Sequence, residues 1–299
     1  MDRPLRLRSF YVFFFILPMF FAACNKFEGE QTIPSYLKID TVFFSTNYPT
    51  QGSKTHNFTD VWVYVNDQLI GAFEMPVTIP ILITGSQKLE IRPGIKLNGI
   101  SATRAPYPFI KPYINNSFTF FQDSIVSLKP TVSYYDNINF VWTEDFEGTG
   151  LSIEKTPQSD TNIAKTQPSN HPEALLSEYS SYSGYVHLEN DKKKFQIASF
   201  NGYDLPGKGT PVFLEIDYKC SRYFGVGLFA NVDNSVVSLP LVVVNQSNVW
   251  NKIYINLSPI VTEYNTARDF KVYFESEKGD DENARFYFDN IKLIYRNNL

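Results

Sequence analysis

The chain has 299 residues and a formal net charge of −4, from 27 lysines and arginines against 31 aspartates and glutamates. An acidic chain without a cluster of basic residues gains nothing from phosphate neutralisation, which argues against nucleic acid as a partner. The length is more than one β-sandwich needs and suits two domains.

Residues 1–23 have the pattern of an export signal. Three arginines precede an apolar run over 10–21, and two alanines precede Cys24. The run is shorter than the roughly 20 residues that cross a bilayer, so we expect cleavage. The segment resembles the lipobox signal of bacterial lipoproteins, with Phe21 where that motif usually carries an aliphatic residue. An ordinary signal peptide with an incidental cysteine and a retained transmembrane anchor are the alternatives.

The resemblance implies that Cys24 becomes the first mature residue and carries a covalent lipid. More than one acyl chain would anchor it firmly to a membrane. Residues 24–34 are then a polar tether, of which the last ten reach about 35 Å when fully extended. Asn25 resembles the residue that follows the cysteine in lipoproteins sent to the outer membrane, and Glu28 and Glu30 resemble export signals of surface lipoproteins in Bacteroidota. The implied location is the outer membrane, facing the periplasm or the cell surface.

Residues 35–133 are predicted to form the first of two domains in an all-β protein. Their strands alternate apolar and polar residues and are separated by turn residues, such as Asn66-Asp67 in a predicted hairpin. The strands are expected at 60–65, 68–73, 78–83, 88–92, 118–121 and 124–128. We expect an antiparallel sandwich of immunoglobulin-like size. The pattern over 61–94 resembles PEGA-like β modules of bacterial surface proteins, without their Pro-Glu-Gly-Ala tetrapeptide.

The segment 101–113 contains three prolines within seven residues, which favours an extended excursion over the surface. Its aromatic residues are Tyr107, Phe109 and Tyr113. They either cap the core of the first domain or form a docking loop that contacts another molecule.

Residues 134–299 are predicted to form a two-sheet jelly roll, with 152–177 as a polar surface loop. The expected strands share short alternating or apolar runs. They lie near 184–189, 195–200, 212–220, 225–231, 239–244, 250–257, 269–275 and 285–295. The stretch 279–283 is most simply a solvated hairpin turn. With Cys24 acylated, Cys220 cannot form an intramolecular disulfide, and its strand face predicts a core position.

Three stretches of this second domain carry a resemblance. Asp145-Phe146-Glu147-Gly148, the run 250–257 and the run 286–293 resemble the galactose-binding-like jelly rolls found among carbohydrate-binding modules. In that family the first and last strands lie adjacent and often hold a structural Ca²⁺. The resemblance implies Glu147 and Asp289 as ligands, with Asp145 as a weaker candidate. Ordinary surface or turn carboxylates are the alternative interpretation.

The same resemblance implies glycan binding, in which aromatic faces stack on sugars while amides and carboxylates hold hydroxyl groups. The candidate ligand-binding residues are Tyr179, Tyr182, Tyr203 and Tyr223. Solvated loop tyrosines are the alternative, and Trp250 is predicted to be a core residue.

Catalysis has little support in the sequence, because it contains no nucleophile elbow, zinc-protease motif or phosphate loop and its three histidines are scattered. We therefore expect a lipid-anchored envelope protein with a non-catalytic binding or adhesion module, for which the resemblance implies glycans as one class of ligand. A structural subunit that binds only envelope proteins is the first alternative. A glycoside-active enzyme that uses two carboxylates is the second.

Overall fold

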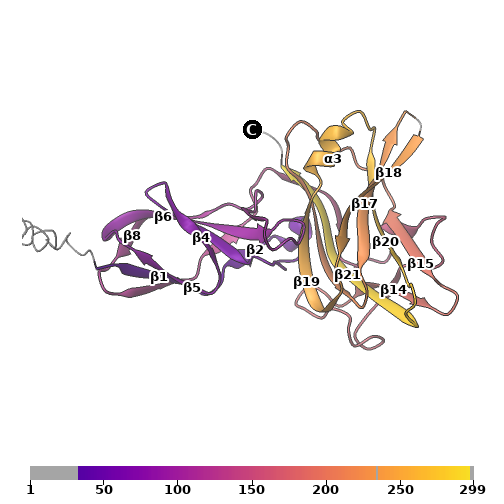
Figure 1. The fold of residues 1–299 in the computed structure, drawn as a ribbon, viewed down its shortest axis with the longest axis horizontal. Helices are drawn as coiled ribbons and strands as arrows, with labels where there is room; N and C mark the ends of the chain where they lie inside the picture. The colour runs from indigo at the N-terminus through magenta and orange to yellow at the C-terminus, as the bar shows by residue number, and fades with distance from the viewer. Residues whose placement is uncertain (1–32, 234, 297–299) are drawn as a thin grey trace, which may run out of the picture.

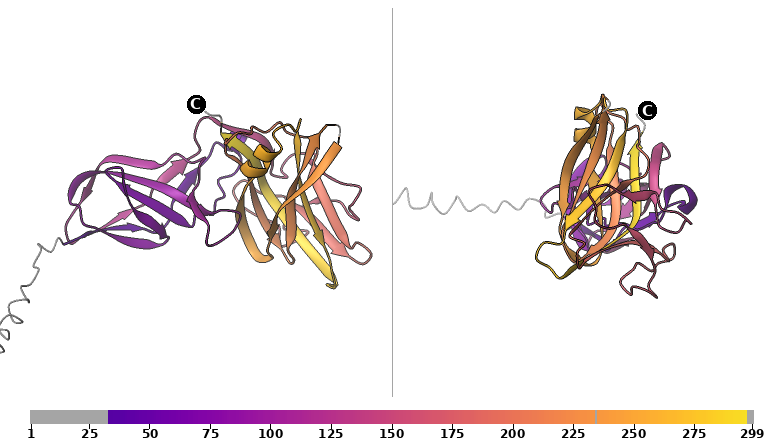
Figure 2. Two further views of the ribbon diagram at one scale, coloured as in Figure 1. Left: turned by 45° about the horizontal axis from the view of Figure 1, so that its top comes forward. Right: turned by 90° about the vertical axis from the view of Figure 1, so that its right-hand side faces the viewer.

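The computed structural model describes residues 33–233 and 235–296. The predicted export signal, Cys24 and most of the tether lie outside the described residues. Two β-rich lobes follow one another along the long axis of the molecule, as Figure 1 and the turned views of Figure 2 show. No helix in the described part of the chain has both the length and the apolar character needed to span a bilayer.

The first lobe contains three small sheets and one short helix. The sheets have the strand orders β5-β1-β9, β10-β2 and β4-β3-β6-β7, and β8 also pairs with β6. The elements are β1 Ser35–Ile39, β2 Phe43–Ser45, α2 Tyr48–Gln51, β3 Asp60–Val65, β4 Gln68–Glu74, β5 Val77–Ile81, β6 Gly85–Lys96, β7 Arg104–Pro106, β8 Tyr113–Phe120, β9 Ile125–Leu128 and β10 Thr131–Ser133.

Local sequence predicted the hairpin of this lobe but not all of its pairing. Asn66 and Asp67 both have positive φ, as a tight hairpin turn requires, and they join β3 to β4. The expectation of a purely antiparallel domain was wrong, because β1 pairs with β9 and β2 with β10 in parallel. Each parallel pair joins segments about 90 residues apart in the sequence, so the connection is long enough for a parallel crossover.

The second lobe is a β-sandwich of two antiparallel sheets. One sheet has the order β13-β14-β21-β16-β19 with β11 on β21, and the other has the order β12-β15-β20-β17-β18. The elements are β11 Ile138–Glu144, β12 Ile153–Lys155, β13 Ala164–Thr166, β14 Ser183–Glu189, β15 Lys194–Ser199, β16 Val212–Cys220, β17 Phe224–Val232, β18 Ser235–Val244, β19 Ser247–Asn256, α3 Ser258–Glu263, β20 Phe270–Glu277 and β21 Asn283–Arg296.

The eight strands predicted for this lobe after residue 183 are all present, with bounds that differ by no more than four residues. The polar stretch 152–177 is not wholly a loop, since it contributes the short edge strands β12 and β13. Cys220 faces the core and is 2% exposed, which confirms its predicted position. Burial raises the pKa of its thiol to about 11, so the thiolate needed for reaction is scarce at neutral pH.

The proline-rich excursion packs against the second lobe. Tyr107 and Phe109 are buried, and both rings contact Phe213 of β16, with centroids 5.7 and 5.4 Å apart. Tyr107 also contacts Tyr254 of β19 at 4.7 Å. The core of the first lobe therefore continues into the sandwich, and these aromatic residues cap it there.

Candidate binding cleft between the lobes

A cleft of about 490 Å³ opens where the two lobes meet, within the range of small-molecule sites. Two loops and the strands β16 and β19 build its walls. The lining residues are Ser53, Lys54, Thr55, His56 and Asn57 from the first lobe, and Leu175, Ser177, Glu178, Tyr179, Asp217, Trp250, Asn251 and Lys252 from the second.

Trp250 and Tyr179 provide the aromatic surface of the cleft. Trp250 is half-buried, and its indole N–H donates to the carbonyl of Glu173 at 2.9 Å. Tyr179 stacks on Tyr48 with a centroid distance of 4.6 Å and an interplanar angle of 16°. The prediction that Trp250 is a core residue was wrong, because β19 is the edge strand of its sheet and this end of it lines the cleft instead. Both rings are held by contacts before any ligand binds.

Amide and hydroxyl groups from both lobes form the polar wall of the cleft. The Asn57 amide donates to Asn251 Oδ1 at 2.9 Å and to the carbonyl of Lys252 at 3.1 Å. Ser53 Oγ lies 3.1 Å from Thr55 Oγ1, which accepts from Lys252 Nζ at 3.3 Å. Such groups donate and accept hydrogen bonds and therefore suit hydroxyl-rich ligands.

The floor of the cleft rests on a buried charge network, which consists of Glu215, Asp217, Lys252 and Lys292. Lys252 Nζ lies 3.2 Å from a carboxylate oxygen of Glu215 and 3.2 Å from one of Asp217. Burial alone would raise the pKa of Glu215, but Lys252 and Lys292 outweigh it and hold that pKa below its usual value. The four charges sum to zero, so the floor favours neither an anion nor a cation.

Tyr107 of the first lobe and Tyr134, which lies in the connection between β10 and β11, complete this network. The hydroxyls of Tyr107 and Tyr134 donate to Glu215 Oε1 at 2.7 and 2.8 Å. Lys292 Nζ donates to the carbonyl of Ser53 at 2.7 Å. The network thus ties both lobes to the strands beneath the cleft.

His56 stacks on Phe58 at the side of the cleft, with ring centroids 4.7 Å apart. Burial and the charge of Lys252 lower the pKa of the imidazole. His56 is therefore neutral at pH 7, and among the described residues its Nδ1 has no hydrogen-bond partner.

The structure separates the four tyrosines that the sequence suggested as ligand-binding residues. Tyr179 lines the cleft, whereas Tyr223 lines a second groove. Tyr203 stacks on Trp142, and burial raises its pKa to about 12. Tyr182 lies beneath Lys165, whose Nζ is 4.0 Å from the ring centroid. Neither Tyr182 nor Tyr203 lines the cleft or the second groove.

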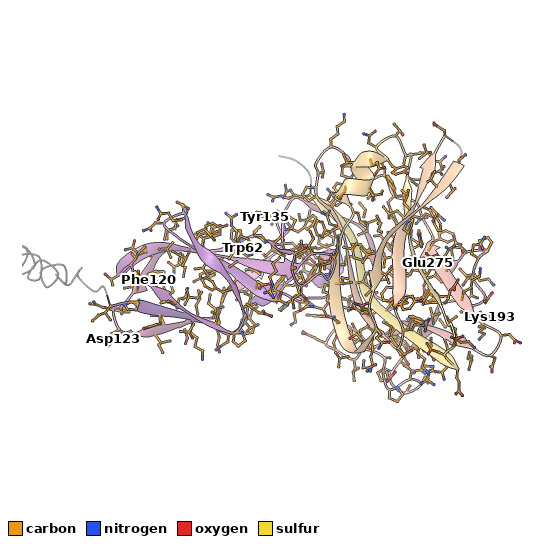
Figure 3. All side chains as sticks on the ribbon, viewed as in Figure 1. Trp62, Phe120, Asp123, Tyr135, Lys193 and Glu275 are labelled. Atoms are coloured by element: carbon orange, nitrogen blue, oxygen red, sulfur yellow. The ribbon has the colours of Figure 1, made fainter. Side chains whose placement is uncertain are left out.

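The second groove crosses the outer face of the other sheet, on the side of the sandwich where Figure 3 labels Glu275. Gln196 donates to Glu275 at 2.8 Å and accepts from Thr156 at 2.6 Å. Gly225 lies beside Glu275, and a Cβ on it would come within 3.3 Å of that side chain. Tyr223 is 47% exposed and lies at this groove.

The predicted calcium ligands lie near one another but are already hydrogen-bonded. Asp145 accepts from the Tyr48 hydroxyl at 2.7 Å and from the backbone N–H of Glu147 at 3.1 Å. One Glu147 oxygen accepts two further backbone N–H groups, at 2.7 and 2.8 Å. Asp289 is buried and accepts from Ser183 at 3.3 Å.

Burial and the neighbouring charges of Asp217 and Glu147 raise the pKa of Asp289 well above its usual value. No group of three or more acidic, histidine or cysteine side chains is arranged for a metal within the described residues. As they stand, these carboxylates do not fit a calcium cage, and no step of the proposed function runs through the ion. The calcium site stays a prediction.

Comparison with known proteins gives a likeness of fold. No protein-family model and no curated protein matches the sequence. Solved structures match about half of the chain. One contains the CBM22-1 and GH10 modules of Clostridium thermocellum endo-1,4-beta-D-xylanase 10B complexed with xylohexaose, at 14% identity and a TM-score of 0.40. The match covers 53% of this chain and 28% of that one.

Two further matches are isolated carbohydrate-binding modules. A family 11 module from Clostridium thermocellum, in complex with a beta-1,3-1,4-mixed-linked tetrasaccharide, matches at 14% identity and a TM-score of 0.34. A family 28 module specific for non-crystalline cellulose matches at 16% identity and a TM-score of 0.37. Each match covers 52% of this chain and 94% of the other. At these scores no residue role follows from the likeness.

Proposed function

We propose that this chain is a lipid-anchored envelope protein that binds a neutral glycan, without catalysis, in the cleft between its lobes. One observation carries the proposal. The rings of Trp250 and Tyr179 are held in position in one cleft, beside amide and hydroxyl groups, and the charged residues beneath the cleft have zero net charge. Aromatic faces suit the apolar faces of sugar rings, and the amides and hydroxyls suit sugar hydroxyl groups.

The ion pairs and hydrogen bonds of the carboxylates in the cleft support binding rather than hydrolysis. A glycosidase needs a carboxylic acid whose pKa is raised so that it can donate a proton. Glu178 instead pairs with Lys54 at 2.7 Å, and the hydrogen bond from Lys54 lowers its pKa. Asp217 is paired with Lys252 and accepts from the Asn290 amide at 2.9 Å. Both carboxylates therefore already accept hydrogen bonds from neighbouring side chains.

A glycan array probed with the whole mature protein should yield neutral oligosaccharide ligands. Trp250→Ala should weaken binding of the best ligand at least tenfold, because truncation of an aromatic anchor costs about 2 kcal/mol or more and each step of about 1.4 kcal/mol is a factor of ten in affinity. Calorimetric titration measures the change in affinity.

Tyr223→Ala is the matched control, because Tyr223 is also a partly exposed aromatic residue but lies in the second groove. It should leave the affinity unchanged. A loss with Tyr223→Ala and none with Trp250→Ala would contradict the cleft proposal. An array without ligands, together with a stable complex with an envelope protein, would favour the structural-subunit alternative.

The lipid anchor has its own test. Mass spectrometry of the mature N-terminus should give a peptide that begins at Cys24 and carries acyl chains. Cys24→Ala should release most of the protein from the membrane fraction, since the acyl chains on this cysteine would be its main attachment. An unmodified Cys24, or an intact leader before it, would overturn the anchor without affecting the cleft.

A further inference from the structure

Large apolar side chains are exposed at the end of the first lobe that lies farthest from the second lobe. Ile33, Leu82, Phe121 and Ile125 are 48%, 65%, 58% and 65% exposed. They are called the apolar tip below. Single exposed apolar residues are ordinary on protein surfaces, but a group of them at one end marks an interaction site.

Strand pairing places these four residues at the same end. Tyr36 of β1 pairs with Ile125, and Ser35 pairs with Ile81, the neighbour of Leu82. Gly85, which follows Leu82 closely, pairs with Phe120, the neighbour of Phe121. Figure 3 labels Phe120 and Asp123 at this end, where the described chain begins.

Backbone hydrogen bonds fix the connection between the start of the described chain and the β8–β9 turn. The Asp123 N–H donates to the carbonyl of Pro34 at 3.0 Å, and the Tyr36 N–H donates to that of Ser124 at 2.9 Å. Phe121 follows the buried Phe120 directly, so the alternation of side chains directs its ring outward. Hydrogen-bonded turns therefore fix the position of the apolar tip.

We propose that the apolar tip is a membrane-contacting surface that inserts into the interfacial layer of a lipid bilayer. The proposal rests on the lipid anchor proposed for Cys24. Ile33 is nine residues beyond Cys24, which is at most about 32 Å of extended chain. The anchor would thus keep the tip within reach of the bilayer surface, and no other end of the described molecule is so close to Cys24 in sequence.

The charge of the tip determines the kind of lipid contact. Among residues 33–35, 82–86 and 121–125 the one charged side chain is Asp123. A surface without cations gains nothing from anionic headgroups, whereas apolar side chains gain from leaving water. The contact should therefore be independent of anionic lipid and of salt.

Site-specific fluorescence tests the contact on the mature, lipidated chain. Cys220 is buried with a raised thiol pKa and should not react at pH 7, so Phe121→Cys supplies a single labelling site for an environment-sensitive dye. Val236→Cys, at an exposed position of β18 in the second lobe, is the matched control. Both are incorporated into phosphatidylcholine vesicles that contain lipids with a quencher near the headgroup.

We expect the dye at position 121 to be quenched at least threefold more than the dye at position 236. Adding anionic lipid or salt should not change this ratio. Leu82→Ser with Ile125→Ser should reduce the quenching at position 121, whereas Val243→Ser in the second lobe should not. Thermal melts of each variant identify any that fail to fold.

Equal quenching at the two positions in a lipidated protein would overturn the inference and leave the anchor intact. Quenching at position 121 that requires anionic lipid would also overturn it. A blue shift at position 121 that develops without vesicles as protein concentration rises would assign the tip to contact with a second copy. An unmodified Cys24 would remove the anchor and this inference together.

Discussion

Replacing Lys252 with methionine should lower the free energy of unfolding by about 3–5 kcal/mol, because it leaves buried carboxylates without their main cation. The Lys252 side chain is 3% exposed, and the carboxylates of Glu215 and Asp217 on either side are 1% and 6% exposed. Burial alone would lower the pKa of Lys252, but the charges of Asp217 and Glu215 raise it. The ammonium group is therefore charged in the folded protein. The methionine keeps most of the apolar stem and removes the ammonium group, with its charge and its hydrogen bonds to Thr55 and Asp217.

Urea denaturation at pH 7 measures this effect. Lys271→Met is the matched control, because Lys271 forms an ion pair with Glu154 at the same distance, 3.2 Å, on the exposed surface. Such surface pairs contribute less than about 1 kcal/mol. Equal effects of the two substitutions would show that the network does not stabilise the junction.

A double variant separates the loss of the pair from the cost of an unpaired charge. Glu215→Gln combined with Lys252→Met removes one carboxylate together with its cation, so it should be less destabilising than the sum of the two single changes. The hydroxyls of Tyr107 and Tyr134 can still donate to the amide oxygen of the glutamine. Additive effects would contradict the direct coupling of Glu215 and Lys252.

Local patterns in the sequence predicted the strands well but not how distant segments meet. Alternation and turn residues, such as Asn66-Asp67, depend on neighbours within a few positions and were sufficient for the hairpin of β3 and β4. The cleft depends on contacts over long separations, since Tyr107 reaches Glu215 across 108 residues. No local periodicity contains that information.

The buried charges nevertheless left a signal in the sequence. Lys252 precedes an apolar run in β19, and Lys292 interrupts the run Ile291-Lys292-Leu293-Ile294 in β21. A lysine within a strand that is otherwise buried requires a partner. That requirement could have marked both lysines as members of a network, although not its location at the junction of the lobes.

Trp250 shows why the candidate site could not be predicted from residue type. Its place at the start of an apolar strand favoured the core, but whether a strand is central or at an edge depends on the order of the sheet. β19 lies at the edge, and loops from both lobes turn its exposed end into a cleft wall. The same aromatic residue thus changes from a packing residue to a candidate ligand contact through topology alone.

Lys292 should make the stability of the protein rise with pH. Burial, assisted by the like charge of Lys252, lowers its pKa to about 8 in spite of the attraction of Glu215 and Asp217. In the unfolded chain the pKa returns to its ordinary value of about 10.4. Below pH 8 both states hold the proton, and the folded protein bears the cost of a buried ammonium group.

Between pH 8 and about 10.4 the folded protein loses this proton while the unfolded chain retains it. The unfolded state then binds more protons, so stability rises with pH, by about 2 kcal/mol between pH 7.5 and 9.5. Lys252 does not contribute in this window, because its pKa is raised. The raised pKa of the Cys220 thiol has the opposite effect, since the unfolded thiol ionises first.

Comparison with Lys292→Met isolates the contribution of this lysine, because both proteins retain Cys220 and the buried tyrosines. The free energy of unfolding of wild type and of Lys292→Met is measured in urea at pH 7.5, 8.5 and 9.5. Across this series the value for the wild type should rise by about 2 kcal/mol relative to the value for the variant. A difference that stays constant with pH would show that the ammonium of Lys292 keeps its ordinary pKa. In that case Glu215 and Asp217 would offset the lowering of both lysine pKa values by burial. All four side chains of the network beneath the cleft would then be ionised.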